Sequence, residues 1–470
     1  MTHNQPLMPA PYSNGNSCRV NAPNGKNKDE IGGKITVCGG TFQRDDWTNI
    51  SPKILSYLGR NLHIQPYHPL SFIRQNIVSF LYKKFVGRTG NPIFSVYDNL
   101  SPVVSVEQNF DSLITPATHP SRDKSDCYYI NHKYLLRGHT TAHQSELINM
   151  GLNNFLVVGD VYRRDEIDAS HYPVFHQADA VRICMQEEVF RRVPNGEALQ
   201  VFEKSGMRTE DKQQEHTLEA TKLMETELKS TLLCLAQSLL GQGLVHRWVA
   251  TTFPFTHPSW ELEVLHKDKW VELLGCGIME HAILHKGMDR VLIDVVISII
   301  LRQVLGVPWD LMCLTHLTTQ LIQESNTGPL ALYANALTTE FSRYRPMPRV
   351  NLHPYLKAES TVIAVTNNYS TGAGDRIGWA FGVGLERMAM IIYDIPDIRL
   401  FWSTDSGFLC QFNNKTANDV IKYKAVSMYP QCINDISFWL PEDRLYSPND
   451  FYDLVRSIAG DIVEQVCFDS

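Results

Sequence analysis

Apolar residues recur every three or four positions in two long stretches of the chain, which predicts amphipathic helices. The first stretch begins at Pro69, a residue that is favoured in the first turn of a helix. Its apolar face carries Leu70, Ile73, Ile77, Phe80 and Leu81. The second stretch covers residues 212–242, where polar and apolar positions follow the same period.

Shorter apolar runs of the kind that strands show are spread over the rest of the chain. They cover residues 102–113, 154–164, 175–183, 246–255, 260–266, 269–279 and 378–384. The last run continues through glycines into a helical pattern, with Leu385, Met388 and Ile392 on one face. Because helices and strands do not alternate regularly, the sequence predicts an α+β fold with a largely antiparallel sheet.

Composition places this chain among globular proteins, with 470 residues, 43% hydrophobic and 20% charged. The net charge of −7 gives no overall basic field for nucleic acid. Ten cysteines without a CxxC pair fit a reducing compartment rather than a disulfide scaffold. The apolar run at 291–307 is too short for a membrane span and contains charged residues, so no membrane contact is expected. Residues 1–40 are expected to be disordered, and their single arginine, Arg19, makes a weak transit signal.

The richest polar stretch is "GDVYRRDEIDASHYPVFHQADAVRI", residues 159–183. Folded as an antiparallel hairpin, it directs alternate side chains of both strands to one face. That face would carry Arg163, Asp165, Phe175, Gln177 and Asp179, with His171 in the loop between the strands. A guanidinium suits phosphate, a ring suits a base, and a carboxylate suits an ammonium group. The alternative is a solvated charged hairpin without a ligand.

Two further segments suggest ligand contacts. Gly382 allows close approach of the backbone, and Arg387 lies near the start of the following helix, although glycines before a helix are usually plain turns. In "RGHTTAHQ", His139 and His143 stand four residues apart, a spacing that could bind zinc. Without a third ligand, hydrogen bonding of a small polar ligand by His139, Thr141 and Gln144 is the preferred interpretation.

In "FPFTHPS", Phe253 and Phe255 alternate along a strand, and Gly275 and Gly277 in "LGCGIM" leave room beside them. Core packing is the ordinary role of two such rings. The alternative is a pocket for an aromatic side chain, since contacts between rings favour such a ligand.

Together these segments resemble the class II aminoacyl-tRNA synthetases, and among them the single-chain mitochondrial phenylalanyl-tRNA synthetases. "YRRD" followed by "DASHYPVFHQ" is similar to motif 2 of the class, and "GVGLER" is similar to motif 3. "VEQNFDSLITPATHPSRD" resembles the motif 1 region, and "YPQCINDISFWLP" resembles the start of the C-terminal anticodon-binding domain. The resemblance covers roughly residues 41–284 and 374–466 and implies a six-stranded antiparallel sheet flanked by helices.

The resemblance also implies roles for the residues. Arg163 would contact the α-phosphate of ATP, and Phe175 and Arg387 would enclose the adenine. Asp165 would also belong to the ATP site, and His171 would lie near the phosphates. Glu272 is the candidate ligand of Mg²⁺. The groups around phenylalanine would be His139, Thr141, Gln144, Gln177, Asp179, Phe253, Phe255, Gly275, Gly277 and Gly382. Two positions depart from the family by one methylene, since Asp165 and Asp179 stand where glutamate is usual.

The expected activity is phenylalanine–tRNA ligation, with ATP and Mg²⁺, by a monomer in the mitochondrial matrix that acts on tRNA(Phe). A carboxylate is already ionised at neutral pH, so adenylation needs no side-chain base. A non-catalytic synthetase-like protein that binds RNA or protein is the alternative. A biotin or lipoate ligase is disfavoured because such enzymes use a lysine-centred site.

The resemblance divides the chain into a catalytic domain, 41–411, and a linker with a truncated ferredoxin-like domain, 412–470. An insertion at about 285–373 interrupts the first, either as a lineage-specific segment or as an untrimmed intervening sequence. In the second, "KYKAVSMYPQCINDISFWLP" would supply a first strand and its approach. "SPNDFYDLVRSIAGDIVEQV", residues 447–466, predicts a helix with an apolar side. That side would consist of Phe451, Leu454, Val455 and Ile458. We expect residues from about 420 onward to pack loosely against the catalytic domain or to stay mobile, and we expect tRNA charging to be weak.

Overall fold

The computed structural model describes residues 32–285, 373–426, 432–439 and 447–468. The chain divides into two compact units, residues 1–284 with 374–470 and residues 285–373. The elements below all belong to the first unit. The expected insertion coincides with the second and, except for its two end residues, lies outside the described residues.

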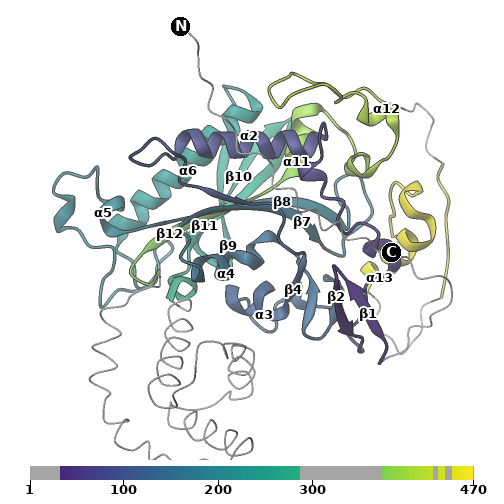
Figure 1. Ribbon diagram of the computed structural model, residues 1–470, viewed down its shortest axis with the longest axis horizontal. Coiled ribbons are helices and arrows are strands. Elements are labelled where there is room, and N and C mark those ends of the chain that lie inside the picture. The colour runs from purple at the N-terminus through teal and green to yellow at the C-terminus, as the bar shows by residue number, and fades with distance from the viewer. Residues whose placement is uncertain (1–31, 286–372, 427–431, 440–446, 469–470) are drawn as a thin grey trace, which may run out of the picture. The chain divides into compact units, whose positions relative to one another are not determined.

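A seven-stranded sheet forms the centre of the first unit (Figure 1). In spatial order it consists of β3 (Ser95–Tyr97), β7 (Asn154–Tyr162), β8 (Val174–Cys184), β12 (Ile377–Gly384), β11 (Lys269–Met279), β10 (Thr256–His266) and β9 (His246–Phe253). The six strands from β7 to β9 are antiparallel to their neighbours, as the resemblance implied. The short edge strand β3 runs parallel to β7 and was not predicted.

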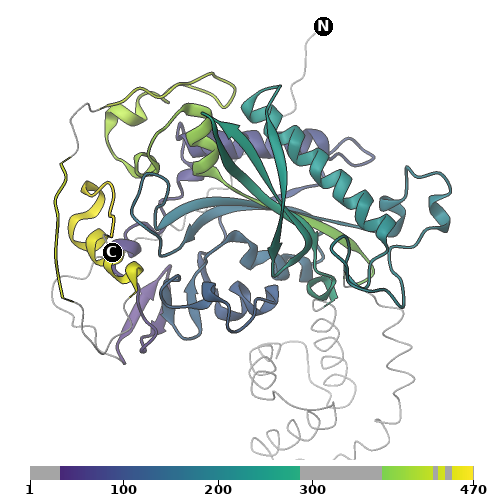
Figure 2. The ribbon, with the colours of Figure 1, turned by 180° about the vertical axis from the view of Figure 1, so that it is seen from behind.

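Three helices cover one face of this sheet, α2 (Pro69–Lys84), α6 (Leu218–Leu240) and α11 (Leu385–Tyr393), as Figures 1 and 2 show. Leu70, Ile73, Ile77 and Leu81 of α2 are almost fully buried, which confirms the predicted face. They join Leu228 and Leu232 of α6 in one large core. The α6 and α11 helices also lie where the periodicity predicted them.

The opposite face carries a smaller layer (Figure 1). It contains the three-stranded sheet β4 (Val103–Ser105), β6 (Tyr134–Leu136) and β5 (Tyr129–Asn131) with α3 (Val106–Asn109), η4 (Thr140–His143) and α4 (Gln144–Asn149). The predicted strand at 102–113 is wrong beyond Ser105. The Ser105 side chain accepts from the Gln108 N–H and the Gln108 side chain accepts from Ser105, a capping box that starts a helix there.

Shorter elements complete the unit. They are β1 (Lys34–Val37), β2 (Gly40–Gln43), α1 (Pro52–Leu55), η1 (Leu62–Ile64), η2 (Asp111–Leu113), η3 (Pro120–Arg122), α5 (Gln186–Val189), η5 (Gly196–Ala198), η8 (Ile398–Trp402) and α12 (Ser406–Leu409). The β1–β2 hairpin begins before residue 41, so the ordered core starts earlier than expected. Within the described residues, no helix is long and apolar enough to cross a bilayer.

The C-terminal segment contains α13 (Pro448–Ala459) and η9 (Gly460–Ile462). Ser447 is the N-cap of α13, and Pro448 opens the helix. The predicted buried face is wrong, because the structure buries Tyr452 and Arg456. Leu454 and Ile458 are instead 53% and 78% exposed. The strand expected before this helix is also absent from the described residues 421–426 and 432–439.

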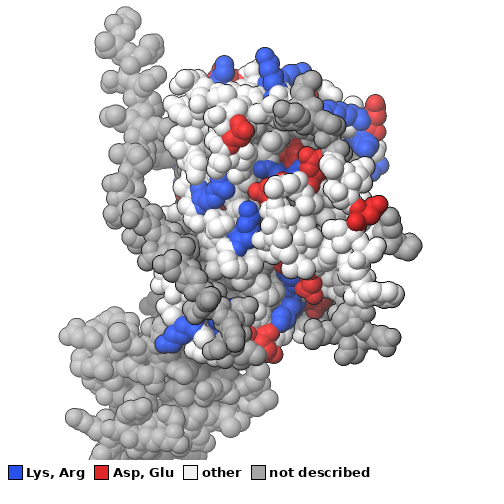
Figure 3. All heavy atoms as spheres, turned by 90° about the vertical axis from the view of Figure 1, so that its right-hand side faces the viewer, with Lys and Arg blue, Asp and Glu red and all other residues white. Residues whose placement is uncertain are grey.

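Figure 3 shows the face at the right of Figure 1. On the described part of this face, Lys and Arg side chains lie in small groups beside Asp and Glu. The mixture agrees with the modest net charge of −7.

Candidate active site

The hairpin of β7 and β8 has the register that the alternation requires. Val161 pairs with Phe175, and Gly159 pairs with Gln177, so Phe175, Gln177 and the next alternate residue, Asp179, face the same side. The Arg163 N–H still donates to the Pro173 carbonyl at 3.0 Å, although β7 ends at Tyr162. Asp165 lies in the loop beyond, so the strand argument that placed it on this face does not hold.

Arg163 is held by the segment that precedes η4. Its Nε donates to the Gly138 carbonyl at 2.7 Å. Its guanidinium carbon lies 5.2 Å from the centre of the Phe175 ring, within the range of a cation–π contact. Because only Nε takes part in this hydrogen bond, the two Nη groups are available for an anionic ligand. The Phe175 ring beside them offers a stacking surface.

Asp179 is a buried carboxylate, 3% exposed, between η4 and β12. The Thr141 hydroxyl donates to it. A Cβ added at Gly382 would lie 2.5 Å from its Oδ1, so only glycine leaves room for this carboxylate. Burial raises the pKa of Asp179 to about 6, against the lowering effects of Thr141, Thr140 and Arg163.

The two histidines of "RGHTTAHQ" do not form a metal pair. His143 Nε2 accepts from Arg137 Nη1 at 2.9 Å, so that nitrogen is occupied. Burial, and then the charge of Arg137, lowers the pKa of His143 to about 3. Burial, followed by Arg163 and His143, lowers the pKa of His139 to about 3 as well. Both rings are neutral at pH 7.

Two amide side chains accompany these groups. Gln144 opens α4 and is 3% exposed. Gln177 on β8 carries an Oε1 that is buried without a partner in the described protein. A buried amide oxygen without a donor is costly, which suits a site whose ligand supplies one.

The two phenylalanines lie together at the end of β9 and in the turn to β10. The rings of Phe253 and Phe255 stack at 5.8 Å with an interplanar angle of 6°, and the His139 ring lies 6.3 Å from Phe255. A Cβ at Gly275 would approach the Phe253 ring to 2.8 Å, so this glycine makes room for that ring. Gly277 serves another purpose, because a Cβ there would meet Thr256 and the Pro258 carbonyl.

Arg387 and Glu272 form an ion pair at 3.1 Å, each about half-exposed. Sequence reasoning missed Glu261, which lies on the neighbouring strand, β10. Burial, and then the charge of Glu272, raises the pKa of Glu261 above its ordinary value. The alternation in "WELEVLH" beside Glu272 could have indicated it. Two crowded carboxylates are a donor set that suits Mg²⁺.

His171 lies in the loop of the hairpin. Its Nδ1 lies 2.8 Å from Asp168 Oδ2, and its backbone N–H donates to Asp168 Oδ1 at 2.7 Å. Side chains of Glu166, Asp168 and His171 converge within 4.8 Å. This loop geometry fixes the His171 side chain on its own segment, and no described contact ties it to Arg163.

The C-terminal helix is attached to this same hairpin, contrary to the expected loose packing. Arg164, 8% exposed, donates from Nε to Asp453 at 2.6 Å and from Nη2 to Asp450 at 2.8 Å. Arg456 donates to the Glu166 carbonyl, and Tyr172 donates to Asp461 at 2.9 Å. Sequence reasoning overlooked Arg164, because its partners lie almost 300 residues away.

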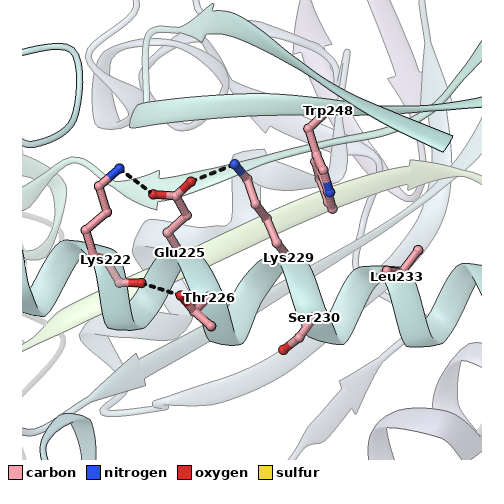
Figure 4. Close-up of a pocket in the computed structure, with 7 residues that line it drawn as sticks. All are labelled: Lys222, Glu225, Thr226, Lys229, Ser230, Leu233 and Trp248. Carbon is pink, nitrogen blue, oxygen red and sulfur yellow. Dashed lines mark hydrogen bonds and ion pairs between the residues drawn. The ribbon is translucent and has the colours of Figure 1, made fainter.

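A separate hollow of about 430 Å³ lies between α6 and β9, on the helix side of the sheet (Figure 4). Its lining residues are Lys222, Glu225, Thr226, Lys229, Ser230, Leu233 and Trp248. Glu225 accepts from Lys222 at 3.0 Å and from Lys229 at 2.6 Å, and Lys222 also donates to Asp211 at 2.7 Å, so each cation already has a carboxylate partner. It takes no part in the site on the other face.

Comparison with known families defines the class of this fold. The model of the tRNA synthetases class II core domain (F) matches residues 67–198, 207–293 and 363–412. The match includes the hairpin, the two phenylalanines and Arg387, and it leaves out residues 294–362. The sheet and its polar face are therefore those of a class II aminoacyl-tRNA synthetase core.

Curated relatives narrow the assignment. A probable mitochondrial phenylalanine–tRNA ligase of Drosophila melanogaster is 47% identical over 92% of this chain and 81% of its own length. The mitochondrial phenylalanine–tRNA ligase of Mus musculus is 43% identical over 93% of this chain and 77% of its own length. A pyrrolysyl-tRNA synthetase structure from Desulfitobacterium hafniense is 10% identical, covers 75% of this chain and 79% of its own, and has a TM-score of 0.36. At that TM-score it adds nothing to the assignment. The chain belongs to the mitochondrial phenylalanine–tRNA ligases.

Proposed function

We propose that this protein activates L-phenylalanine with ATP and transfers it to tRNA(Phe), the activity for which its relatives are named. The observation that carries the proposal is the meeting of a guanidinium, an aromatic ring and a buried carboxylate on one face of the β7–β8 hairpin. These groups are Arg163, Phe175 and Asp179.

In the first step, the phenylalanine carboxylate attacks the α-phosphorus of ATP, and pyrophosphate leaves. Asp179 binds the ammonium group of phenylalanine, and the Gln177 carbonyl oxygen accepts a further hydrogen bond from it. Phe253 and Phe255 contact the phenyl ring. Arg163 stabilises the charge that develops on the α-phosphate, a kind of contribution worth about 3–4 kcal/mol in comparable sites.

The adenine lies between Phe175 and Arg387, which therefore has to leave Glu272 when ATP binds. Glu272 and Glu261 would hold Mg²⁺, which would supply positive charge beside the phosphates. In the second step, a hydroxyl of the terminal adenosine of tRNA attacks the acyl carbon, its proton passes to the phosphate of the departing AMP, and AMP leaves. Neither step requires a side-chain base, so positioning of the reactants accounts for the rest of the rate acceleration.

The relatives are named mitochondrial, and we place this protein in the mitochondrial matrix, where its tRNA occurs. A monomer suffices, because every group assigned above comes from one chain. The residue roles are supported by the geometry of the described residues and by the match to the class II core.

Phenylalanine-dependent ATP–pyrophosphate exchange tests the function. Exchange with phenylalanine, and at least tenfold less with leucine at equal concentration, is the expected result. A folded protein that binds tRNA but gives no exchange would instead support the alternative of a non-catalytic RNA-binding relative.

A further inference from the structure

His176 occupies the position between Phe175 and Gln177 on β8. Since alternate residues of a strand face opposite sides, its side chain enters the helix layer while its two neighbours face the site. The His176 side chain is completely buried there. Its partner is Glu386, the second residue of α11, which is 2% exposed and adjacent to the exposed Arg387.

The Glu386 carboxylate makes two hydrogen bonds to one residue. Its Oε2 accepts from the His176 backbone N–H at 2.8 Å, and its Oε1 lies 2.7 Å from His176 Nδ1. A carboxylate only accepts, so the ring carries its proton on Nδ1. Hydrogen bonds to charged groups contribute more than neutral ones, and loss of a buried partner leaves a group unsatisfied.

The position of this pair at the end of the β8–β12 pairing explains why a side chain has to accept the His176 backbone N–H. The β8–β12 register ends at Gln177 opposite Gly384. The next pair would be His176 opposite residue 385, but the chain has already turned into α11 at that point. The Glu386 carboxylate therefore accepts the N–H that a strand carbonyl would otherwise take, and it extends the pairing of the two segments by one residue.

Two further rings fix the histidine from the other sides. Trp402 stacks on it at 5.6 Å with an interplanar angle of 23°. The His63 ring lies 5.2 Å away and is itself held by the Asp98 carbonyl at 2.8 Å. The histidine has no freedom to follow a displaced helix, so Glu386 holds the start of α11 in one place.

We propose that His176 and Glu386 are positioning residues that fix the separation of Phe175 and Arg387, and so set the affinity for ATP without touching it. The inference rests on the adenine-binding roles proposed for those two neighbours. Each member of the pair is covalently adjacent to one side of the adenine site, so a shift between them changes the width of that site. Asp179, Phe253 and Phe255 of the phenylalanine site lie farther along the sheet. Gln177 is adjacent to His176, but it is paired with Gly159 and Gly384 on both sides, so phenylalanine binding depends less on this pair.

Steady-state exchange kinetics of Glu386→Gln test this proposal. We expect the KM for ATP to rise about tenfold, equivalent to about 1.4 kcal/mol, and the KM for phenylalanine to stay within twofold of wild type. Glu227→Gln is the matched control, because Glu227 accepts from Trp379 Nε1 at 3.0 Å and joins α6 to the far end of β12. It should lower the thermal midpoint without a selective change in the KM for ATP.

His176→Asn provides a second measurement, since its amide can replace the Nδ1 donor while the backbone bond remains. It should raise the KM for ATP less than Glu386→Gln does, and it decides the question if Glu386→Gln is insoluble. An unchanged KM for ATP in Glu386→Gln, or equal rises of KM for both substrates, would overturn the positioning role of His176 and Glu386. Arg387→Ala separates failure of the positioning role from failure of the adenine-binding role. If this variant leaves the KM for ATP unchanged, the adenine-binding role of Arg387 itself is wrong.

Discussion

Substitution of Gly382 by alanine should damage phenylalanine binding selectively. The added Cβ would lie 2.5 Å from Asp179 Oδ1, well inside contact distance, so the buried carboxylate has to move. Movement weakens the hydrogen bond from Thr141 and the bond to the ligand's ammonium group. A hydrogen bond to a charged group contributes about 1.5–3 kcal/mol, which corresponds to roughly a 10- to 150-fold rise in KM for phenylalanine.

Gly384→Ala is the matched control. Gly384 lies two residues farther on the same strand and the same face, yet its nearest neighbour to a new Cβ is an Arg387 carbon at 4.0 Å. Exchange measured against phenylalanine concentration should show near-normal KM for Gly384→Ala and a large rise for Gly382→Ala, with both proteins folded. A KM within twofold of wild type for Gly382→Ala would refute the placement of Asp179 beside the substrate.

Three further predictions concern pH, the C-terminal helix and the insertion. Because burial raises the pKa of Asp179 to about 6, the carboxylate becomes protonated as pH falls through 6, so kcat/KM for phenylalanine should fall there. Asp179→Asn should remove this inflection. Asp453→Asn should lower the thermal midpoint by a few degrees, and Asp450→Asn by less, because their side chains are 17% and 64% exposed. Deletion of residues 285–373 should leave the midpoint and exchange unchanged, since the family match leaves out most of that segment; loss of soluble protein would contradict this.

Periodicity predicted α2 well because one face of this helix is apolar and buried. Continuous apolar runs predicted the strands from β7 to β12, because central strands such as β7 and β12 are buried on both faces. Periodicity failed for α13, where the buried residues include Arg456 and the docking partner is the charged Arg164. An apolar pattern cannot reveal a helix that is held by ion pairs.

The candidate site was predicted where residues alternate along a regular strand. The prediction was wrong for Asp165, because β7 ends three residues earlier, at Tyr162. Glu261 was missed because its significance comes from Glu272 on a neighbouring strand, and pairing registers are not visible in one sequence. His176 and Glu386 were not singled out either, because their partnership spans 210 residues.

Phenylalanine-dependent pyrophosphate exchange by Arg163→Ala tests the central claim most directly. The account predicts at least a 100-fold loss relative to wild type in a protein with an unchanged thermal midpoint, because the arginine acts on charge that develops at the α-phosphate. Near-normal exchange by the folded variant would contradict the assignment of this face of β7 and β8 as the adenylating site.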